Sequence, residues 1–374
     1  MTAKNKIRAI AFYLPQYHPI PENNEWWGKG FTEWTNVTKA KPLFKNHYQP
    51  ILPSDLGYYD LRLPETRKAQ AEMARLHGIE GFCYWHYWFG NGKRVLERPF
   101  NEVLKSGDPD FPFCLGWANE SWTGIWHGNP KKILAEQLYP GREDYINHFN
   151  YLFKAFSDKR YITVEGKPLF YIYSPDKIPD LIYFTDLFRE LAQRSGLKGL
   201  YIVANSSDAN WNPQENGCDA VNLTLLGDLY RHLPLSNNLI HKKYRQQLLK
   251  PKVGNLYRTI FKKPVNVYEY RDAIKHLTIS GKKNYDCYPS VVPNWDNTAR
   301  SNLHALILHN STPELFAIHL NNALELVKNN NTEKKIIFIK SWNEWAEGNF
   351  LEPDQKHGNR YLQVLKKSID QFNA

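Results

Sequence analysis

The segment KSWNEWAEGNFLEP, residues 340–353, holds the residues whose types and spacing best suit catalysis. Glu344 and Glu347 lie three positions apart, each directly beside a tryptophan, and a third acid follows at Glu352. The run KKIIFIK comes directly before this segment, and its isoleucines predict a short buried strand. Carboxylates at the end of such a strand are costly to bury unless they have a partner or a chemical task.

Two carboxylates at this spacing can act on a glycosidic bond. If the chain turns helically after Ser341, Glu344 and Glu347 face the same way, with Cβ atoms roughly 5–6 Å apart. Carboxyl groups at about that separation can work as an acid and an assisting base. Mutual repulsion and tryptophan walls are expected to raise the pKa of one carboxyl, so that it stays protonated near neutral pH. The structural alternative is a helix N-terminus, where acids in the first turn are favourable.

Polar and aromatic side chains also follow the other apolar runs of the chain. In a parallel barrel the carboxyl ends of all strands form one face, and active sites are built there. Glu33 and Trp34, in the long loop after the first run, are expected to cap the cleft. Taken singly, any one of these tryptophans or histidines is explained better by core packing. The residues expected to line the sugar subsites are Tyr13, Trp85, His86, Tyr87, Trp117, Asn119, Glu120, Trp122, Asn205, Trp295, Trp342, Asn343, Trp345 and Glu352.

The elements that must position these residues alternate between apolar strands and amphipathic helices. Strands are predicted to begin near positions 7, 79, 111, 168, 200, 220, 287 and 335, mostly with helices between them. Eight such units predict an α/β fold, a closed (β/α)8 TIM barrel that spans residues 1–374 as a single domain. A doubly wound open sheet is the alternative, but no GxGxxG follows a strand. The polar, basic segment 227–286 is too long for one connection and is predicted to be an insertion.

Composition narrows the class of protein further. Aromatic residues make up 14% of the chain, and flat aromatic faces suit sugar rings, although a large core explains the count as well. The net charge is +10, but the lysines are dispersed and no nucleic-acid motif is present, so no nucleic-acid partner is expected. A peripheral contact with an anionic membrane surface or a lipid-linked glycan stays open as an alternative.

Cysteine and histidine spacing argues against metals and disulfides. The four cysteines are far apart, and Cys83 and Cys114 lie in apolar runs, where a thiol acts as a small core residue. No HxH or HExxH spacing occurs, so no metal or other cofactor is expected. The N-terminal apolar run is too short for a secretory signal, and no run approaches about 18 apolar residues. A cytoplasmic location is therefore expected, with the inner face of the membrane as the peripheral alternative.

Five long segments together resemble WbsX-type proteins. They are AFYLPQYHPIPENNEWWGKGFTEWTNV, FCYWHYWF, WANESW, VVPNWDNTAR and SWNEWAEG, and the resemblance covers essentially the whole chain. WbsX-type proteins are called glycosyltransferases because they occur in polysaccharide gene clusters, and they are similar to the endo-α-mannosidases of glycoside hydrolase family 99. The resemblance implies a metal-free (β/α)8 barrel. It also implies that Glu344 assists the sugar's own 2-hydroxyl as an internal nucleophile, and that Glu347 is the acid/base of a retaining reaction.

Three function classes follow. The first is a retaining glycoside hydrolase or transglycosylase that acts on a polysaccharide or oligosaccharide. The second is a sugar-nucleotide-dependent glycosyltransferase in the biosynthesis of a cell-surface polysaccharide such as lipopolysaccharide. No DxD-like metal motif supports the second class, but the expected location and the gene context do. The third is a non-catalytic glycan-binding barrel, which has little need for two adjacent carboxylates.

Overall fold

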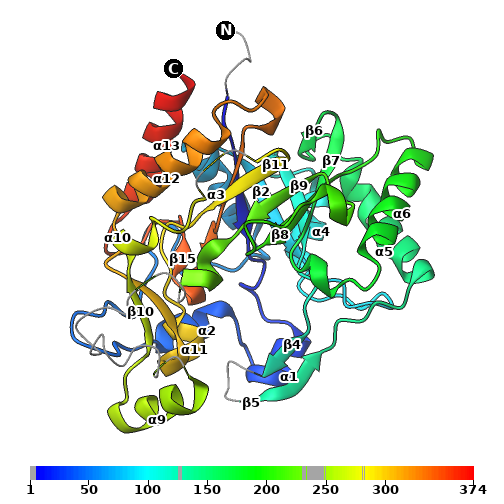
Figure 1. Ribbon diagram of the computed structural model, residues 1–374. Helices are drawn as coiled ribbons and strands as arrows, with labels where there is room; N and C mark the ends of the chain where they lie inside the picture. The colour runs from blue at the N-terminus through cyan, green and yellow to red at the C-terminus, as the bar shows by residue number, and fades with distance from the viewer. Residues whose placement is uncertain are drawn as a thin grey trace.

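The chain folds into a closed parallel barrel (Figure 1). The computed structural model describes residues 6–124, 129–229, 233, 248, 250–279, 281 and 283–374. Eight parallel strands follow one another around the barrel, and the pairings of β1 with β13 and of β3 with β7 close it. This closure excludes the open doubly wound sheet. The strands are β1 (Arg8–Tyr13), β2 (Ile79–His86), β3 (Phe113–Trp117), β7 (Lys167–Ile172), β8 (Tyr201–Ser206), β9 (Ala220–Leu223), β11 (Asp286–Val291) and β13 (Ile336–Ile339).

Amphipathic helices cover the outside of the barrel (Figure 1). In α5 the buried residues Tyr145, His148, Phe149, Leu152 and Phe156 recur at helical spacing, so one stripe of the helix faces the strands. The helices predicted between the strands are present. They are α3 (Pro64–Leu76), α4 (Arg98–Ser106), α5 (Arg142–Phe156), α6 (Leu181–Arg194), α12 (Pro313–Val327) and α13 (Arg360–Asn373).

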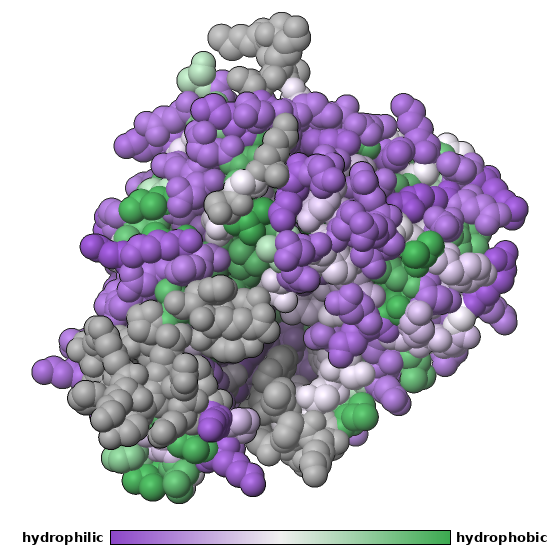
Figure 2. All heavy atoms as spheres, in the orientation of Figure 1, coloured by the Kyte–Doolittle hydropathy of each residue, from purple (hydrophilic) through white to green (hydrophobic). Residues whose placement is uncertain are grey.

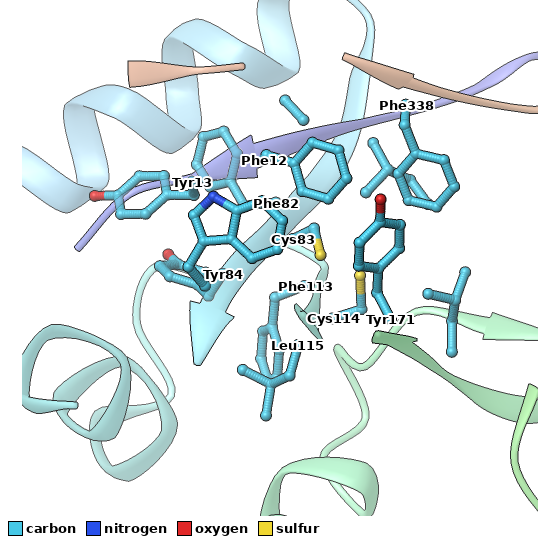
Figure 3. Packing of buried hydrophobic residues seen from close by; sticks show 14 of the residues in the cluster. Phe12, Tyr13, Phe82, Cys83, Tyr84, Phe113, Cys114, Leu115, Tyr171 and Phe338 are labelled. Carbon is cyan, nitrogen blue, oxygen red and sulfur yellow. The ribbon is translucent and has the colours of Figure 1, made fainter. Parts of the chain in front are cut away.

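The barrel interior is filled by large side chains (Figure 3). Phe12 lies against Tyr171 and Phe338, with ring centroids 4.9 and 5.5 Å apart. Cys83 and Cys114 are fully buried here, which confirms their prediction as core residues. All four residues of β13 are buried, as expected for a strand whose other face packs under helices. The interior is therefore a packed core, and a site can form only at its ends.

Short elements gather at the carboxyl ends of the strands, most of them in the lower half of Figure 1. The connections at this face are longer than those at the opposite face, and the short elements form within them. The helices among them are α1 (Pro21–Trp27), α2 (Glu33–Lys39) and α11 (Thr298–Ser301), and the strands are β4 (Trp122–Gly124), β5 (Asn129–Ala135), β14 (Asn343–Glu344) and β15 (Asn349–Phe350). At the opposite end, β6 (Thr163–Val164) pairs antiparallel with β7.

The described part of segment 227–286 contains its own elements. These are α9 (Pro251–Phe261), β10 (Asn266–Glu269) and α10 (Tyr270–Ala273). Strand β10 pairs in parallel with β12 (Leu306–His309), a strand that the sequence pattern does not predict. Residues 230–232, 234–247, 249, 280 and 282 of the predicted insertion lie outside the described residues. Within the described ranges, no helix has the length and apolarity needed to cross a bilayer.

Candidate active site

The two predicted catalytic glutamates sit on a tight hairpin rather than on a helix. After β13 the chain forms β14, a single 3-10 turn at Trp345–Glu347 and β15, with Glu344 opposite Asn349. The α-helical turn considered after Ser341 therefore does not form, and a 3-10 turn begins only at Trp345. The cause is local, because the Ser341 hydroxyl donates to the Asn349 carbonyl at 2.7 Å and accepts from the Glu344 N–H at 3.2 Å. These bonds close a hairpin in place of a helix.

Asp296 fixes the turn that carries Glu347. The Asp296 N–H donates to the Glu347 carbonyl at 2.8 Å. Gly348 follows at φ +54°, and a Cβ there would lie 2.6 Å from the Asp296 carbonyl oxygen, so only glycine fits. The Asp296 carboxylate is held in turn by His47 Nε2 and Gln49 Nε2, each at 2.7 Å. The backbone of Glu347 is therefore positioned by a rigid, hydrogen-bonded support.

Arg300 joins both glutamates to a third acid. Its Nη1 lies 2.6 Å from Glu347 Oε1 and 3.5 Å from Glu344 Oε2, and its Nη2 lies 2.9 Å from Glu33 Oε1. Because both contacts share one nitrogen, these two oxygens are at most roughly 6 Å apart, near the separation of about 5–5.5 Å in retaining glycosidases. Lys340 adds a second cation, with Nζ 4.0 Å from Glu347 Oε2. The cluster therefore holds three carboxyl groups and two cations.

Burial and charge set the protonation of this cluster. Burial and the neighbouring charge of Glu347 raise the pKa of Glu344 to about 7, although Lys340 and Arg300 oppose the shift. Burial also raises the pKa of Glu33, against the opposing Arg300. For Lys340 burial acts against its charge, but Glu347 and Glu344 outweigh burial and raise its pKa. Near neutral pH Glu344 thus holds a proton part of the time.

A cavity of about 370 Å³ opens directly above the glutamates. The indole N–H of Trp85 donates to Glu344 Oε1 at 3.0 Å, so one aromatic wall is tied to the pair. Trp27, Tyr87, Trp122 and Tyr173 supply further aromatic surface. Flat aromatic faces beside carboxylates suit a sugar ring, which has apolar C–H faces and polar edges. Among the described residues, no group of three or more His, Cys, Asp or Glu side chains could hold a metal ion.

A second cavity, of about 480 Å³, continues past Glu347. It shares Trp85, Tyr173, Lys340 and Glu347 with the first cavity, so the two meet at these side chains. Glu344 lines only the first cavity. The far wall of the second cavity is formed by Asn205, Ser206, Asp208, Trp211 and Trp295. The geometry is a cleft with space on both sides of Glu347.

Eight of the residues predicted from sequence line one or both of these cavities. Trp85 and Glu347 line both cavities. The other six are Tyr87, Glu120, Trp122 and Glu344 in the first cavity and Asn205 and Trp295 in the second.

Six others form the layer beneath the cavities. Glu352 accepts hydrogen bonds from Trp345 Nε1 at 2.6 Å, Gln70 Nε2 at 2.7 Å and Tyr59 OH at 2.8 Å. Burial raises the pKa of Glu352 to about 7, although these bonds oppose the shift. The structure therefore places Glu352 in a buried network rather than in a sugar subsite. The other five, all buried in this layer, are Tyr13, Trp34, Trp342, Asn343 and Trp345.

The remaining four predicted site residues lie away from the cavity walls. His86 points to the helix layer, where its Nε2 lies 2.9 Å from His148 Nε2, and burial lowers its pKa to about 3. Trp117 is 1% exposed and donates to the Trp88 carbonyl at 2.9 Å, and Asn119 donates to the Ser174 carbonyl at 2.7 Å. Glu33 belongs to α2 and is buried against Arg300, so it supports the site and does not cap it.

Among the residues of the first cavity that the sequence pattern did not identify, five carry a charged, amide or aromatic side chain. Lys340 and Tyr173 each come directly after a barrel strand, a position that could have identified them. Gln16 and Trp27 follow β1, in a segment rich in polar and aromatic residues. Arg300 gave no such signal, because it sits on the four-residue helix α11, within a connection between strands.

Sequence comparison identifies the family of the chain. The family model for "Glycosyltransferase WbsX" matches residues 9–365. The chain is also 32% identical over 361 residues to an uncharacterized protein, WxcX, of Xanthomonas campestris pv. campestris (strain B100). The same protein of a second strain, ATCC 33913, is equally similar. The match covers 96% of this chain and 49% of WxcX, so the chain spans about half the length of the curated relatives it matches.

Solved structures share the fold at low sequence identity. A glycoside hydrolase-like protein superposes with a TM-score of 0.61 at 15% identity, over 99% of this chain and 95% of the other. The GH99 endo-α-mannosidase of Bacteroides thetaiotaomicron superposes with a TM-score of 0.55 at 16% identity, over 98% and 97% of the two chains. These similarities confirm the (β/α)8 barrel. The family match over residues 9–365 shows that this chain belongs to the WbsX glycosyltransferase family.

Proposed function

We propose that the chain breaks or remakes glycosidic bonds of a polysaccharide or oligosaccharide, with Glu344 and Glu347 as the catalytic pair and with retention of configuration. The observation that carries this proposal is the contact of both carboxylates with one Arg300 nitrogen, at 2.6 and 3.5 Å, beneath an aromatic cavity. Carboxyl groups this close leave no room for the water of an inverting reaction, which needs about 6.5–9.5 Å. The similarity to a GH99 endo-α-mannosidase supports the same class of chemistry.

The two cavities support different roles for the two glutamates. An acid/base must reach the oxygen that joins the two sugars, so it belongs where the space for one sugar meets the space for the next. Glu347 lines both cavities and meets this requirement. Glu344 lines only the first cavity, where it can accept a hydrogen bond from a hydroxyl of the sugar that is attacked. We therefore assign Glu347 as the acid/base and Glu344 as the assisting base.

A proton must move within the pair before the bond is cleaved. Arg300 and Lys340 lie against Glu347, and the pKa of Glu344 is raised to about 7. A sugar hydroxyl that donates to Glu344 stabilises its carboxylate, so the proton of the coupled pair shifts to Glu347. Glu344 takes the proton of the 2-hydroxyl, whose oxygen bonds to the anomeric carbon as Glu347 protonates the leaving oxygen and the glycosidic bond breaks. Glu347 then removes a proton from the incoming water or acceptor hydroxyl, whose oxygen bonds to the anomeric carbon, and Glu344 returns its proton to the 2-oxygen as the strained ring opens.

A release assay tests this proposal. Purified wild type is incubated with surface polysaccharide of the source organism, without a sugar nucleotide, and new reducing ends are measured. Wild type should release them, and Glu347→Gln and Glu344→Gln should not, while Glu143→Gln, at an exposed position on α5, should match wild type. An aryl glycoside with a good leaving group needs little acid assistance, so it should restore bond cleavage to Glu347→Gln but not to Glu344→Gln. Release by the Glu347→Gln variant at the wild-type rate would remove Glu347 from this role.

The second candidate is sugar transfer in the biosynthesis of a cell-surface polysaccharide such as lipopolysaccharide. The family that matches residues 9–365 is described as a glycosyltransferase family, and this description favours sugar transfer. In this case the tube with polysaccharide alone shows no release. Addition of a sugar nucleotide and a lipid-linked acceptor then yields an elongated glycan. Binding of the glycan without either reaction would instead indicate a glycan-binding barrel.

A further inference from the structure

Helix α9 exposes an apolar surface that no other described element matches. Four of its side chains are large, apolar and exposed: Val253 (39%), Leu256 (60%), Ile260 (60%) and Phe261 (58%). Every other described helix or strand exposes at most two such side chains. Figure 2 shows the apolar atoms gathered at the lower left, over α9. Isolated exposed apolar residues are ordinary, but a contiguous group on one helix indicates an interaction surface.

The opposite side of α9 is fixed to the rest of the molecule. Tyr257 packs against a second apolar cluster beside the barrel. Gly254 is buried, and a Cβ there would lie 2.5 Å from the Leu248 carbonyl oxygen, so the helix approaches its neighbour closely at this point. Arg258 Nε donates to the Leu303 carbonyl at 3.0 Å. Since Val253, Leu256 and Ile260 recur at i, i+3 and i+7, they form one stripe on the outward side.

Lysines frame this stripe at both ends. Lys250 and Lys252 lie at the start of α9, and Lys262 and Lys263 directly follow its last turn. All four are exposed. No acidic residue occurs between positions 250 and 265, and the whole chain carries a net charge of +10. The surface is thus apolar at its centre and cationic at its rim.

We propose that this α9 surface binds an anionic phospholipid bilayer. Amphipathic helices of this kind lie in the plane of the interface, with apolar side chains among the acyl chains and lysines at the headgroups. Anionic lipids attract each lysine near the surface. A second copy of the chain is a poorer partner, because it would bring two sets of lysines together across the contact. Charge complementarity therefore favours the bilayer.

The location of α9 relates this surface to the cleft. Figure 1 places α9 at the same end of the barrel as α1, α2 and α11, where the loops after the strands gather. The contact of Arg258 with Leu303 ties α9 to the segment that follows Arg300. A bilayer bound to α9 lies beside the face on which the cavities open. The consequence for the substrate, which rests on the proposed function, is a glycan presented at a membrane surface.

Vesicle sedimentation tests the proposal without any substrate, so its outcome is independent of the catalytic assignment. The full chain is mixed with vesicles of phosphatidylcholine alone or of phosphatidylcholine and phosphatidylglycerol, at low and at high salt. Wild type should pellet with the anionic vesicles at low salt only. The double variants Leu256→Ser with Ile260→Ser, and Lys252→Glu with Lys262→Glu, should each weaken binding roughly tenfold or more.

Two control variants change exposed residues outside α9. Ile318→Ser changes an exposed apolar residue on α12 (51% exposed) and Lys68→Glu changes an exposed lysine on α3, and both should bind as wild type does. Circular dichroism and thermal melts check that the α9 variants remain folded. Equal pelleting of wild type and α9 variants overturns the proposal. So does a wild-type dimer in sedimentation velocity that the α9 variants abolish, since it would identify a second copy as the occupant.

Discussion

At the residue scale, Arg300 links the carboxyl groups of Glu344 and Glu347, because one of its nitrogens contacts both. The residue is 8% exposed, and its guanidinium contacts Glu33, Glu344 and Glu347. Burial acts against the charge of Arg300, but these three acids outweigh burial and raise its pKa well above its ordinary value. Arg300 therefore stays charged near neutral pH, and it supplies a fixed positive potential beside the proposed catalytic pair.

Replacement of Arg300 should change the pH dependence as well as the rate. We expect Arg300→Met to lower kcat by about 10²–10³-fold and Arg300→Lys to lower it less, because only the latter keeps a cation. Loss of the cation disfavours both carboxylates, so the acidic limb of the pH–rate profile should move to higher pH. The pH profile of kcat/KM checks this. An unchanged acidic limb in Arg300→Met would reduce Arg300 to a packing role.

A double variant separates charge balance in the fold from catalysis. Arg300→Met alone leaves Glu33 buried without its cation, which should also lower stability. Arg300→Met with Glu33→Gln removes both charges, so it should recover much of the unfolding free energy but none of the activity. Urea unfolding and kcat, measured on the same samples, compare the two. Recovered activity in the double variant would count against a direct role for the guanidinium.

The basic limb of the profile should belong to Glu347. The wild-type rate should fall at high pH because the acid must be protonated. With an aryl glycoside whose leaving group still gains from acid assistance, wild type should show this limb, whereas Glu347→Gln should cleave the same substrate more slowly and without it. Rates from pH 4 to 9 on one aryl glycoside, for wild type and the variant, give the comparison. A basic limb that persists in Glu347→Gln but disappears in Glu344→Gln would exchange the two roles.

At the element scale, backbone hydrogen bonds around the hairpin β14–β15 fix the positions of Glu344 and Glu347. The Trp342 N–H donates to the Phe12 carbonyl at 2.8 Å and the Lys340 N–H donates to the Val291 carbonyl at 2.9 Å. The segment before the glutamates is thus bonded to both neighbouring strands, β1 and β11. Asp296 then holds the turn itself through the Glu347 carbonyl. The pair is carried by fixed backbone and not by a free loop.

Gly348→Ala should reduce activity without unfolding the protein. The new Cβ would lie 2.6 Å from the Asp296 carbonyl oxygen, so the turn must move and carry Glu347 with it. A displacement of about 1 Å at a catalytic group can cost about 10²-fold in rate. Gly358→Ala is the matched control, because Gly358 has a similar φ of +56° but no atom within 4 Å of the added Cβ. If kcat falls equally in both variants, backbone strain and not displacement of Glu347 is the cause.

At the scale of the whole molecule, acids beneath the site make stability depend on pH. The pKa of Glu352 is raised to about 7 from an ordinary value of 4.5. Between these pH values the folded protein binds more protons than the unfolded chain, so the free energy of unfolding falls as pH rises. Glu352 alone should account for about 3 kcal/mol of this fall.

Urea unfolding at pH 5 and pH 8 measures this dependence. Wild type should lose stability over this interval, and Glu352→Gln should lose less, because its amide does not ionise. The remaining loss in the variant is expected from Glu344, whose pKa is also raised to about 7. Glu65→Gln, at an exposed position on α3, is the control and should match wild type. Equal losses in wild type and Glu352→Gln would show that Glu352 is ionised in the folded protein.

The sequence alone determined the barrel and the face at which its strands end. Eight apolar runs separated by amphipathic stretches predict both the strands and the face at which they end, because burial on both sides of a parallel strand leaves a continuous apolar pattern. KSWNEWAEG could be assigned to the active face for the same reason. Periodicity could not decide which aromatic residues touch a ligand. Trp85 and Trp117 both end a strand, but one lines the cleft and the other packs under α5 and α6.

Only the tertiary structure decided which charges meet. Glu33, Arg300 and Glu347 are separated by 267 and 47 positions, and no local pattern relates them. They come together because β1 and β13 are neighbours in the closed barrel, and α2 and α11 follow strands that end at the same face. Local periodicity records whether a residue is buried, whereas a charge cluster depends on the closure of the sheet. The protonation of Glu344 therefore follows from the fold and not from its own segment.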